Sequence, residues 1–150
     1  MAPDVQMQDA KRSYKPQPAL ERIAQMGVFN TDCEGHQLLS KIANKWTVLI
    51  VYALTQGEKR YATLKQQIAG ISPKMLIQNL RHLERLGLIE RRVFPTSPPS
   101  VDYLLTPLGE SLAEPLAILG DWAYQHIEDV NRASEQFDAS NKEEDFWSPK

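Results

Sequence analysis

The stretch Ala69-Gly70-Ile71-Ser72-Pro73-Lys74 decides the fold of this 150-residue chain. Gly70 permits a tight turn, because glycine adopts backbone conformations that other residues avoid. Ser72 is suited to cap the start of a helix, and Pro73 fits the first helical position, where its missing N–H costs nothing. The stretch therefore predicts a turn followed at once by a new helix.

The predicted helix runs over residues 73–86 and ends at Gly87, and a shorter helix over 62–69 precedes the turn. Two helices joined by a three- or four-residue turn form a helix-turn-helix. An ordinary corner between two helices has the same local signature. The residues that follow the second helix favour the first interpretation.

Residues 88–94 and 101–105 are typical of two β-strands, separated by the proline-rich loop over 95–99. A hairpin directly after a helix-turn-helix forms a winged helix. The predicted fold class is therefore mainly α with a small β-hairpin wing (α+β), a winged helix-turn-helix.

Further helices are expected on both sides of this motif. Residues 46–56 are apolar nearly all round and predict a buried central helix, preceded by helices around 38–42 and 20–27. A final helix is expected to start at Thr106-Pro107 and to reach about Val130, with Pro115 bending or restarting it. The predicted organisation is a flexible arm over 1–18, a domain over 19–130 and an acidic, mobile tail over 131–150.

The formal net charge of −2 hides an uneven distribution along the chain. Residues 36–100 hold ten basic and three acidic side chains (10 − 3 = +7), whereas residues 101–150 hold three basic and eleven acidic ones (3 − 11 = −8). A basic segment of this kind can bind a polyanion while the whole chain stays soluble. Solvated helix faces would give the same count, so the position of the charges on the fold must decide.

The helix over 73–86 separates apolar from polar residues. Leu76, Leu80 and Leu83 share the inner face, and the opposite face carries donors and acceptors suited to base edges in the major groove and to phosphates. The predicted DNA-binding residues, on this helix, on the wing and before the first helix of the motif, are Ser72, Lys74, Gln78, Arg81, His82, Arg85, Arg91, Arg92, Lys59 and Arg60. One of Arg91 and Arg92 should point at the adjacent DNA backbone or minor groove. The alternative is a winged helix that docks an acidic protein partner.

From Cys33 to about Ile127 the sequence resembles the HxlR family of bacterial winged-helix transcriptional regulators. The resemblance rests on many separate positions in the right order, namely Cys33, Lys45-Trp46-Thr47, Gly57, Arg60-Tyr61, Leu64, Gly70-Ile71-Ser72, Met75-Leu76, Leu80, Leu83-Glu84, Gly87-Leu88-Ile89, Arg91, Pro99, Val101, Tyr103, Leu105-Thr106, Gly109, Leu112 and Trp122. Ala43-Asn44 replace the usual glycine pair, and Asp102 replaces the usual Glu.

The resemblance implies a homodimer, most often a repressor, that binds double-stranded operator DNA and pairs through its N- and C-terminal helices. The residues support the pairing, because apolar positions recur along the final helix in a heptad-like seam. Packing of that helix on its own domain would give the same pattern, and we expect the helix to do both, with the short helix over 20–27 completing the interface. The predicted interface residues are Leu20, Ile23, Leu116, Leu119, Trp122, Ala123, His126 and Val130.

Cys33 is the single cysteine of the chain. The resemblance implies redox sensing through this thiol, with an electrophile or oxidant as inducer, and any disulfide would then join two chains or a small thiol. Acidic Asp32 and Glu34 disfavour the thiolate that such chemistry requires, and His36 and Lys41 partly offset them. An inert, partly buried side chain is the alternative.

Other classes of function are disfavoured. No nucleophile-elbow, Walker or metal-ligand spacing occurs, so we expect no enzyme activity, no catalytic residue, no metal and no cofactor. The longest apolar run covers only residues 48–51, and residues 1–15 lack a secretory signal. The expected location is the cytoplasm, without a membrane partner.

Overall fold

The computed structural model describes residues 18–26 and 30–141, which fall into two units, residues 1–42 and 43–150. The first unit holds α1 (Pro18–Gln25) and α2 (Glu34–Ile42), and neither helix buries a residue. The predicted arm lies outside the described residues except for Pro18, which begins α1. The expected end of this helix at Gly27 also lies outside them.

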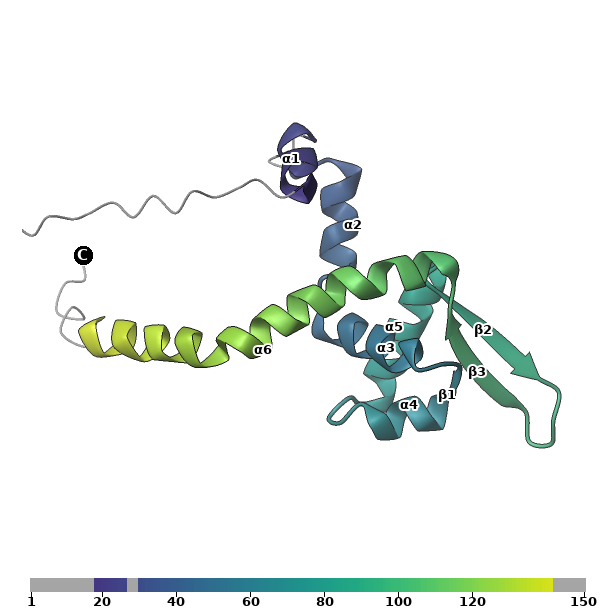
Figure 1. Cartoon of the computed structure of the whole chain (residues 1–150). Helices are drawn as coiled ribbons and strands as arrows, with labels where there is room; N and C mark the ends of the chain where they lie inside the picture. Colours follow the sequence, from purple (N-terminus) through teal and green to yellow (C-terminus); the bar gives the residue numbers. More distant parts are fainter. Residues whose placement is uncertain (1–17, 27–29, 142–150) are drawn as a thin grey trace, which may run out of the picture. The chain divides into compact units, whose positions relative to one another are not determined.

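The second unit is a winged helix, which confirms the predicted fold class. Its elements follow in the order α3 (Lys45–Thr55), β1 (Lys59–Arg60), α4 (Tyr61–Gln67), α5 (Pro73–Arg85), β2 (Ile89–Phe94), β3 (Ser100–Leu105) and α6 (Pro107–Asn141) (Figure 1). The turn between α4 and α5 uses Gly70 at a φ of +81°, and Gly87 has a φ of +71° after α5. Both glycines therefore adopt the left-handed conformation that a side chain disfavours.

The core of the second unit lies between α3, α4, α5 and the base of the wing. Ile50 and Val51 of α3, Leu64 of α4 and Leu76 and Leu83 of α5 have no exposed surface. The continuous apolar sequence of α3 thus corresponds to a central helix, as predicted. The leucines of α5 form the inner face that their spacing indicated.

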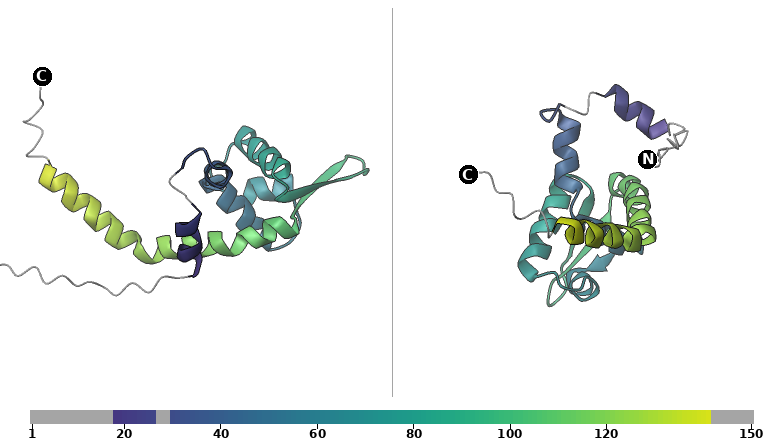
Figure 2. Two further views of the ribbon diagram at one scale, coloured as in Figure 1. Left: turned by 90° about the horizontal axis from the view of Figure 1, so that it is seen from above. Right: turned by 90° about the vertical axis from the view of Figure 1, so that its left-hand side faces the viewer.

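The wing sheet has three antiparallel strands in the order β1-β3-β2, one more than the predicted hairpin. Lys59 and Arg60 of β1 pair with Tyr103 and Asp102 of β3. Strand β1 could not be predicted from the sequence, because two residues are too few to show an alternating pattern. The β2–β3 hairpin projects beyond the helices of this unit (Figure 2).

Helix α6 is longer than predicted, because it continues past Val130 to Asn141. Residues 131–141 contain neither proline nor glycine, and an ion pair between Arg132 and Asp129 (3.2 Å) supports this part of the helix. The expected end near Val130 was therefore wrong, and residues 142–150 of the predicted tail lie outside the described residues. Pro115 lies inside the helix and does not restart it.

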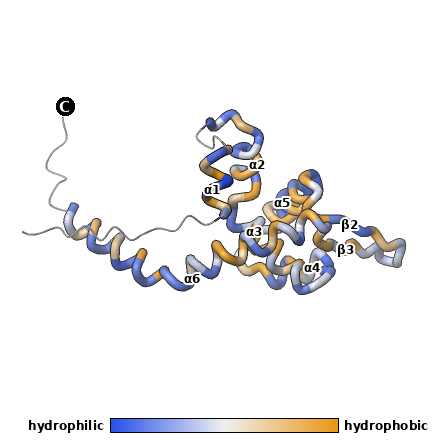
Figure 3. Tube along the Cα trace, turned by 45° about the horizontal axis from the view of Figure 1, so that its top comes forward, coloured by the Kyte–Doolittle hydropathy of each residue, from blue (hydrophilic) through white to orange (hydrophobic). Residues whose placement is uncertain are grey.

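Hydrogen bonds cap the start of α6 and fix its first part to the domain. Thr106 donates its backbone N–H to the Leu88 carbonyl (3.1 Å), and its hydroxyl oxygen accepts from the N–H of Gly109 (3.1 Å). Further along, the hydroxyl of Tyr52 on α3 donates to the Leu116 carbonyl. Apolar and polar segments then alternate along the helix (Figure 3).

Candidate nucleic-acid interface

Helix α5 begins with the cap that its sequence predicted. Ser72 Oγ accepts a hydrogen bond from the backbone N–H of Met75 (3.1 Å), and Pro73 occupies the first turn. This cap satisfies one of the N–H groups that a helix start leaves without a partner. The Ser72 side chain is therefore engaged in the helix start, although the residue remains exposed.

The outward face of α5 carries the predicted base-reading residues. Lys74, Gln78, Arg81 and Arg85 are all exposed, whereas His82 is half-buried and interacts with another group of the protein. Within residues 18–26 and 30–141, Lys74, Arg81 and Arg85 form no ion pair. These three charges are therefore available to an external anion.

The register of the sheet places the basic residues of the wing on two faces. Directly opposite residues of antiparallel strands share a face, so Lys59, Tyr103 and Arg91 form one row, here called the inner row. By the same register Arg60, Asp102 and Arg92 form the outer row on the opposite face. Arg91 and Arg92 therefore point to opposite sides of the wing.

An open hollow of about 440 Å³ lies between the inner row and α5. Arg81 of α5 and Arg91 of β2 both line it, beside Glu84. The remaining lining residues are Tyr61, Ile77, Val101 and Tyr103. The hollow thus brings together one cation of the helix and one of the wing, on the side of the wing that faces α5.

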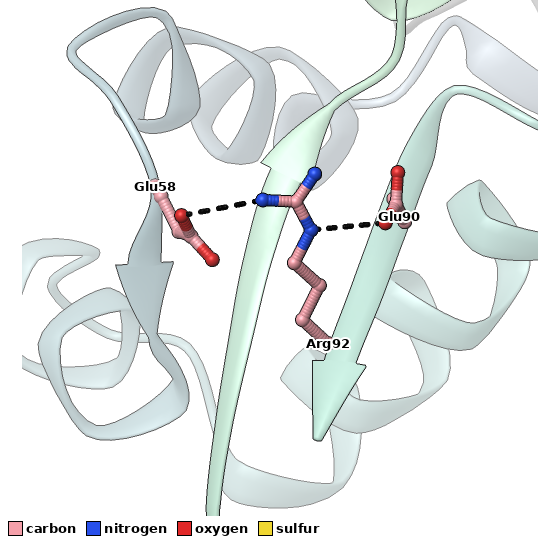
Figure 4. Close-up of polar contacts among 3 residues, drawn as sticks. All are labelled: Glu58, Glu90 and Arg92. Atoms are coloured by element: carbon pink, nitrogen blue, oxygen red, sulfur yellow. Dashed lines mark hydrogen bonds and ion pairs between the residues drawn. The ribbon is translucent and has the colours of Figure 1, made fainter. Parts of the chain in front are cut away.

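Arg92 makes contacts with two carboxylates that the sequence pattern did not indicate. Its Nε donates to Glu90 Oε1 (2.9 Å), and its Nη1 lies 3.7 Å from Glu58 Oε2 (Figure 4). The hydrogen bond and the charge of Glu90, with a smaller contribution from Glu58, raise the pKa of Arg92. In the outer row, Arg60 Nε lies 3.7 Å from Asp102 Oδ1. The structure therefore directs Arg60 and Arg92 toward carboxylates of their own chain.

Most of the predicted interface residues on the terminal helices are exposed in the single chain. Leu119, Trp122 and Val130 are 62%, 54% and 46% exposed, and Leu20 and Ile23 of α1 are 44% and 45% exposed. Ala123 is exposed as well. His126 is half-buried, and its ring is stacked on that of Trp122 with 4.7 Å between the ring centroids.

Leu116 departs from the predicted interface of α6, because its side chain is buried. It is only 7% exposed, because it packs on the domain of its own chain near Tyr52 of α3. At this position α6 therefore packs on the domain of its own chain. Seam residues beyond it stay exposed.

Cys33 directly precedes α2 and is half-buried. The backbone N–H of His36 donates to Cys33 Sγ (3.4 Å), and the Cys33 carbonyl accepts from the N–H of Gln37 (3.1 Å). The sulfur of Cys33 is thus held against the first turn of the helix.

Glu58, Tyr61 and Tyr103 belong to the site but were not predicted as site residues. The alternation of β2 could have separated Arg91 from Arg92, since successive strand residues point to opposite faces. Glu58 could not have been found in this way, because its position depends on β1.

Two absences apply to the described part of the chain. Its His, Cys, Asp and Glu residues form no group of three or more that could hold a metal ion. Among its helices, none has both the length and the apolar character needed to cross a membrane.

Known proteins resemble this chain in sequence and in fold. A family model described as HxlR-like helix-turn-helix matches residues 41–131. The HTH-type transcriptional regulator YtfH of Escherichia coli K12 is 37% identical over 110 residues, which are 73% of this chain and 87% of the relative.

Solved structures agree with this assignment. The transcriptional regulator YtfH from Salmonella typhimurium superposes with a TM-score of 0.66 at 37% identity, over 71% of this chain and 96% of that one. The redox regulator HypR in its oxidised form superposes with a TM-score of 0.58 at 30% identity, over 62% and 96% of the two chains. The chain therefore belongs to the HxlR-like helix-turn-helix family of transcriptional regulators.

Proposed function

We propose that the chain is a homodimeric, sequence-specific DNA-binding protein that acts as a repressor. The observation that carries this proposal is the outward face of α5, where Lys74, Gln78 and Arg81 are exposed together. Arginine and lysine suit the guanine edge and glutamine suits the adenine edge, so this set can read bases in the major groove. A partner recognised by charge alone would not require the amide of Gln78.

The wing supplies a second contact. Arg91 lies in the inner row and shares the hollow with Arg81, so both cations can face one stretch of DNA backbone. Arg91 is exposed and, within the described residues, forms no ion pair. It therefore takes the backbone or minor-groove role that one of the two wing arginines was expected to have.

Dimerisation would cover the exposed apolar side chains of α6 and α1. An isolated helix is only marginally stable in water, so the part of α6 beyond Leu116 is expected to need a partner surface. A twofold dimer would place two copies of α5 about 34 Å apart, one turn of DNA. This spacing predicts an operator with two related half-sites.

Redox control through Cys33 is part of the proposal. The likeness to the redox regulator HypR and the half-buried thiol directly before α2 support it. An oxidant or a quinone-like electrophile would modify Cys33 and change DNA binding.

The test is fluorescence anisotropy on DNA from upstream of the protein's own gene, against a scrambled duplex, over a range of salt concentrations. We expect tighter binding to the upstream fragment and a loss of affinity with salt, because bound phosphates release counterions. Equal affinity for both duplexes at every salt concentration would refute sequence-specific binding. No binding even at low salt would favour an acidic protein partner.

A further inference from the structure

The outer face of the wing sheet holds two groups of ion pairs, Arg60 with Asp102 and Arg92 with Glu58 and Glu90. We propose that Arg92 is a positioning residue, which holds the wing against the helix-turn-helix through its ion pairs with Glu58 and Glu90. Its effect on DNA would therefore act through the position of Arg91. The inference depends on the proposed DNA binding only in the second of the two experiments below, which measures DNA affinity.

The geometry of the guanidinium carries the first step. Nε donates to Glu90 on the same strand (2.9 Å), and Nη1 reaches Glu58 (3.7 Å), the residue directly before β1. Because neighbouring strands lie about 4.8 Å apart, β2 and β1 are separated by about 10 Å, with β3 between them. A long side chain is needed to connect the outermost strand of the wing to the segment that enters α4.

Asp102 lies in the middle of this row and supplies the second step. Its side chain is 19% exposed, and Oδ1 is buried without a hydrogen-bond partner. A buried carboxylate oxygen in this state is costly unless cations compensate it. Arg60 lies on one side at 3.7 Å, and Arg92 is opposite Asp102 in the register on the other side. Arg92 thus lies on the face of the sheet where a second cation can help to compensate this carboxylate.

The two faces of the wing sheet differ in net charge. The carboxylates of Glu58, Glu90 and Asp102 outnumber the guanidinium groups of Arg60 and Arg92. These five side chains therefore carry a net charge of 2 − 3 = −1. A DNA phosphate gains little at such a surface. The hollow on the opposite face holds Arg81 and Arg91 against the single Glu84 and is net positive.

The wing needs such a support because few apolar contacts hold it. Ile89 at its base is 2% exposed, but residues 90–99 are all exposed. Individual ion pairs at exposed sites contribute little in general, although several charges acting together contribute more. Because residues 90–99 are exposed, even a small contribution is enough to change how often the wing lies in its binding position.

The first experiment uses the free protein. Hydrogen exchange of the β2 and β3 amides is measured for the wild type and for Arg92→Gln, Glu58→Gln and the control Arg91→Gln. Arg92→Gln and Glu58→Gln should each increase exchange about two- to fivefold, the factor that matches one exposed ion pair. Arg91→Gln should leave exchange unchanged, since it forms no ion pair in the described part of the chain. Unchanged exchange in Arg92→Gln would overturn the proposal, whatever the DNA result.

The second experiment measures the affinity of the same variants for the upstream duplex as salt is varied. Arg91→Gln should reduce the salt slope by about one, as the loss of a phosphate contact does. Arg92→Gln should weaken binding about two- to fivefold with the slope unchanged. Glu58→Gln should weaken binding as well, although it removes a negative charge.

Two results would contradict this interpretation of Arg92. One is a salt slope in Arg92→Gln that falls as much as in Arg91→Gln, which would make Arg92 a direct contact. The other is tighter binding by Glu58→Gln, which would show that this carboxylate only repels DNA. If no variant and no wild-type protein binds DNA, the proposed function fails, and the exchange experiment alone decides the role of Arg92.

Discussion

The hydroxyl of Tyr52 on α3 occupies the space that a side chain at position 120 of α6 would fill. A Cβ atom at Gly120 would lie 2.5 Å from Tyr52 Oη and 3.4 Å from Cζ. The same hydroxyl donates to the Leu116 carbonyl, one turn earlier in the helix. Gly120 therefore lets α6 approach α3 closely enough for this hydrogen bond.

We expect Gly120→Ala to lower the free energy of unfolding by about 1–3 kcal/mol, because the added methyl group displaces Tyr52. In a Tyr52→Phe background the same substitution should cost much less, since the clashing oxygen is gone. Urea denaturation of the four proteins in this cycle measures the coupling. Gly35→Ala is the control, because a Cβ there meets nothing within 4 Å. Equal costs of Gly120→Ala in both backgrounds would contradict the contact.

Gly109→Ala should destabilise the protein more severely. The new Cβ would clash with the Leu88 carbonyl oxygen, a backbone atom that accepts a hydrogen bond from Thr106 and cannot move away easily. We expect a loss of about 3 kcal/mol or more, read as a large decrease in melting temperature by circular dichroism. The exposed neighbour Ser111, changed to Ala, should leave the melting temperature nearly unchanged. A stable Gly109→Ala protein would show that α6 can start elsewhere.

Ser72 allows stability and DNA binding to be separated. Ser72→Ala should cost about 1 kcal/mol, because the cap on the Met75 N–H is lost. Ser72→Asp should keep the cap and the stability, while its negative charge at the end of α5 that is proposed to face DNA should weaken binding. Chemical denaturation measures the first effect and anisotropy the second. If Ser72→Asp binds DNA as tightly as the wild type, the start of α5 does not approach phosphate.

Gln78 and Arg85 should differ in their effect on DNA binding. Gln78→Ala is expected to relax the preference at one base pair by about 1–3 kcal/mol, since its amide suits adenine. Arg85→Ala should weaken binding to all sequences alike and reduce the salt slope by about one. Competition with a set of single-base operator variants distinguishes these patterns. A uniform loss in Gln78→Ala would place that side chain on the backbone.

The exposed seam of α6 can be tested with a matched pair of aromatic residues. Trp122→Asp should dissociate the proposed dimer, because it places a charge among apolar seam residues. Tyr124, which is 84% exposed and lies on another side of the helix, should tolerate the same change. Sedimentation velocity gives the mass of each variant. A dimer that survives Trp122→Asp would exclude this seam as the interface.

Much of the fold could be predicted because its signals are local. The cap at Ser72, the turn glycine at position 70 and the leucine face of α5 each depend on neighbours within a few residues. The buried character of α3 likewise follows from its continuous apolar sequence. The structure places all of these where the sequence indicated.

The missed features depend on contacts between distant segments. Strand β1 exists only because Lys59 and Arg60 pair with β3, more than forty residues later. The burial of Leu116 depends on α3, so the heptad pattern alone could not separate it from the exposed seam residues. The ion pair between Glu58 and Arg92 has the same cause. Local periodicity carries no information on such pairings.

The alternation of the wing strands also limits how this sequence can change. Arg91 and Arg92 are neighbours in sequence, yet one faces the hollow beside α5 and the other faces Glu58 and Glu90. Deleting or inserting one residue early in β2 would exchange their faces, because strand side chains repeat every two residues. The composition and the net charge would hardly change, but Arg91 and Arg92 would each take the contacts that the other makes now. The number of residues between Gly87 and this arginine pair therefore determines which arginine faces the hollow, independently of the residue types.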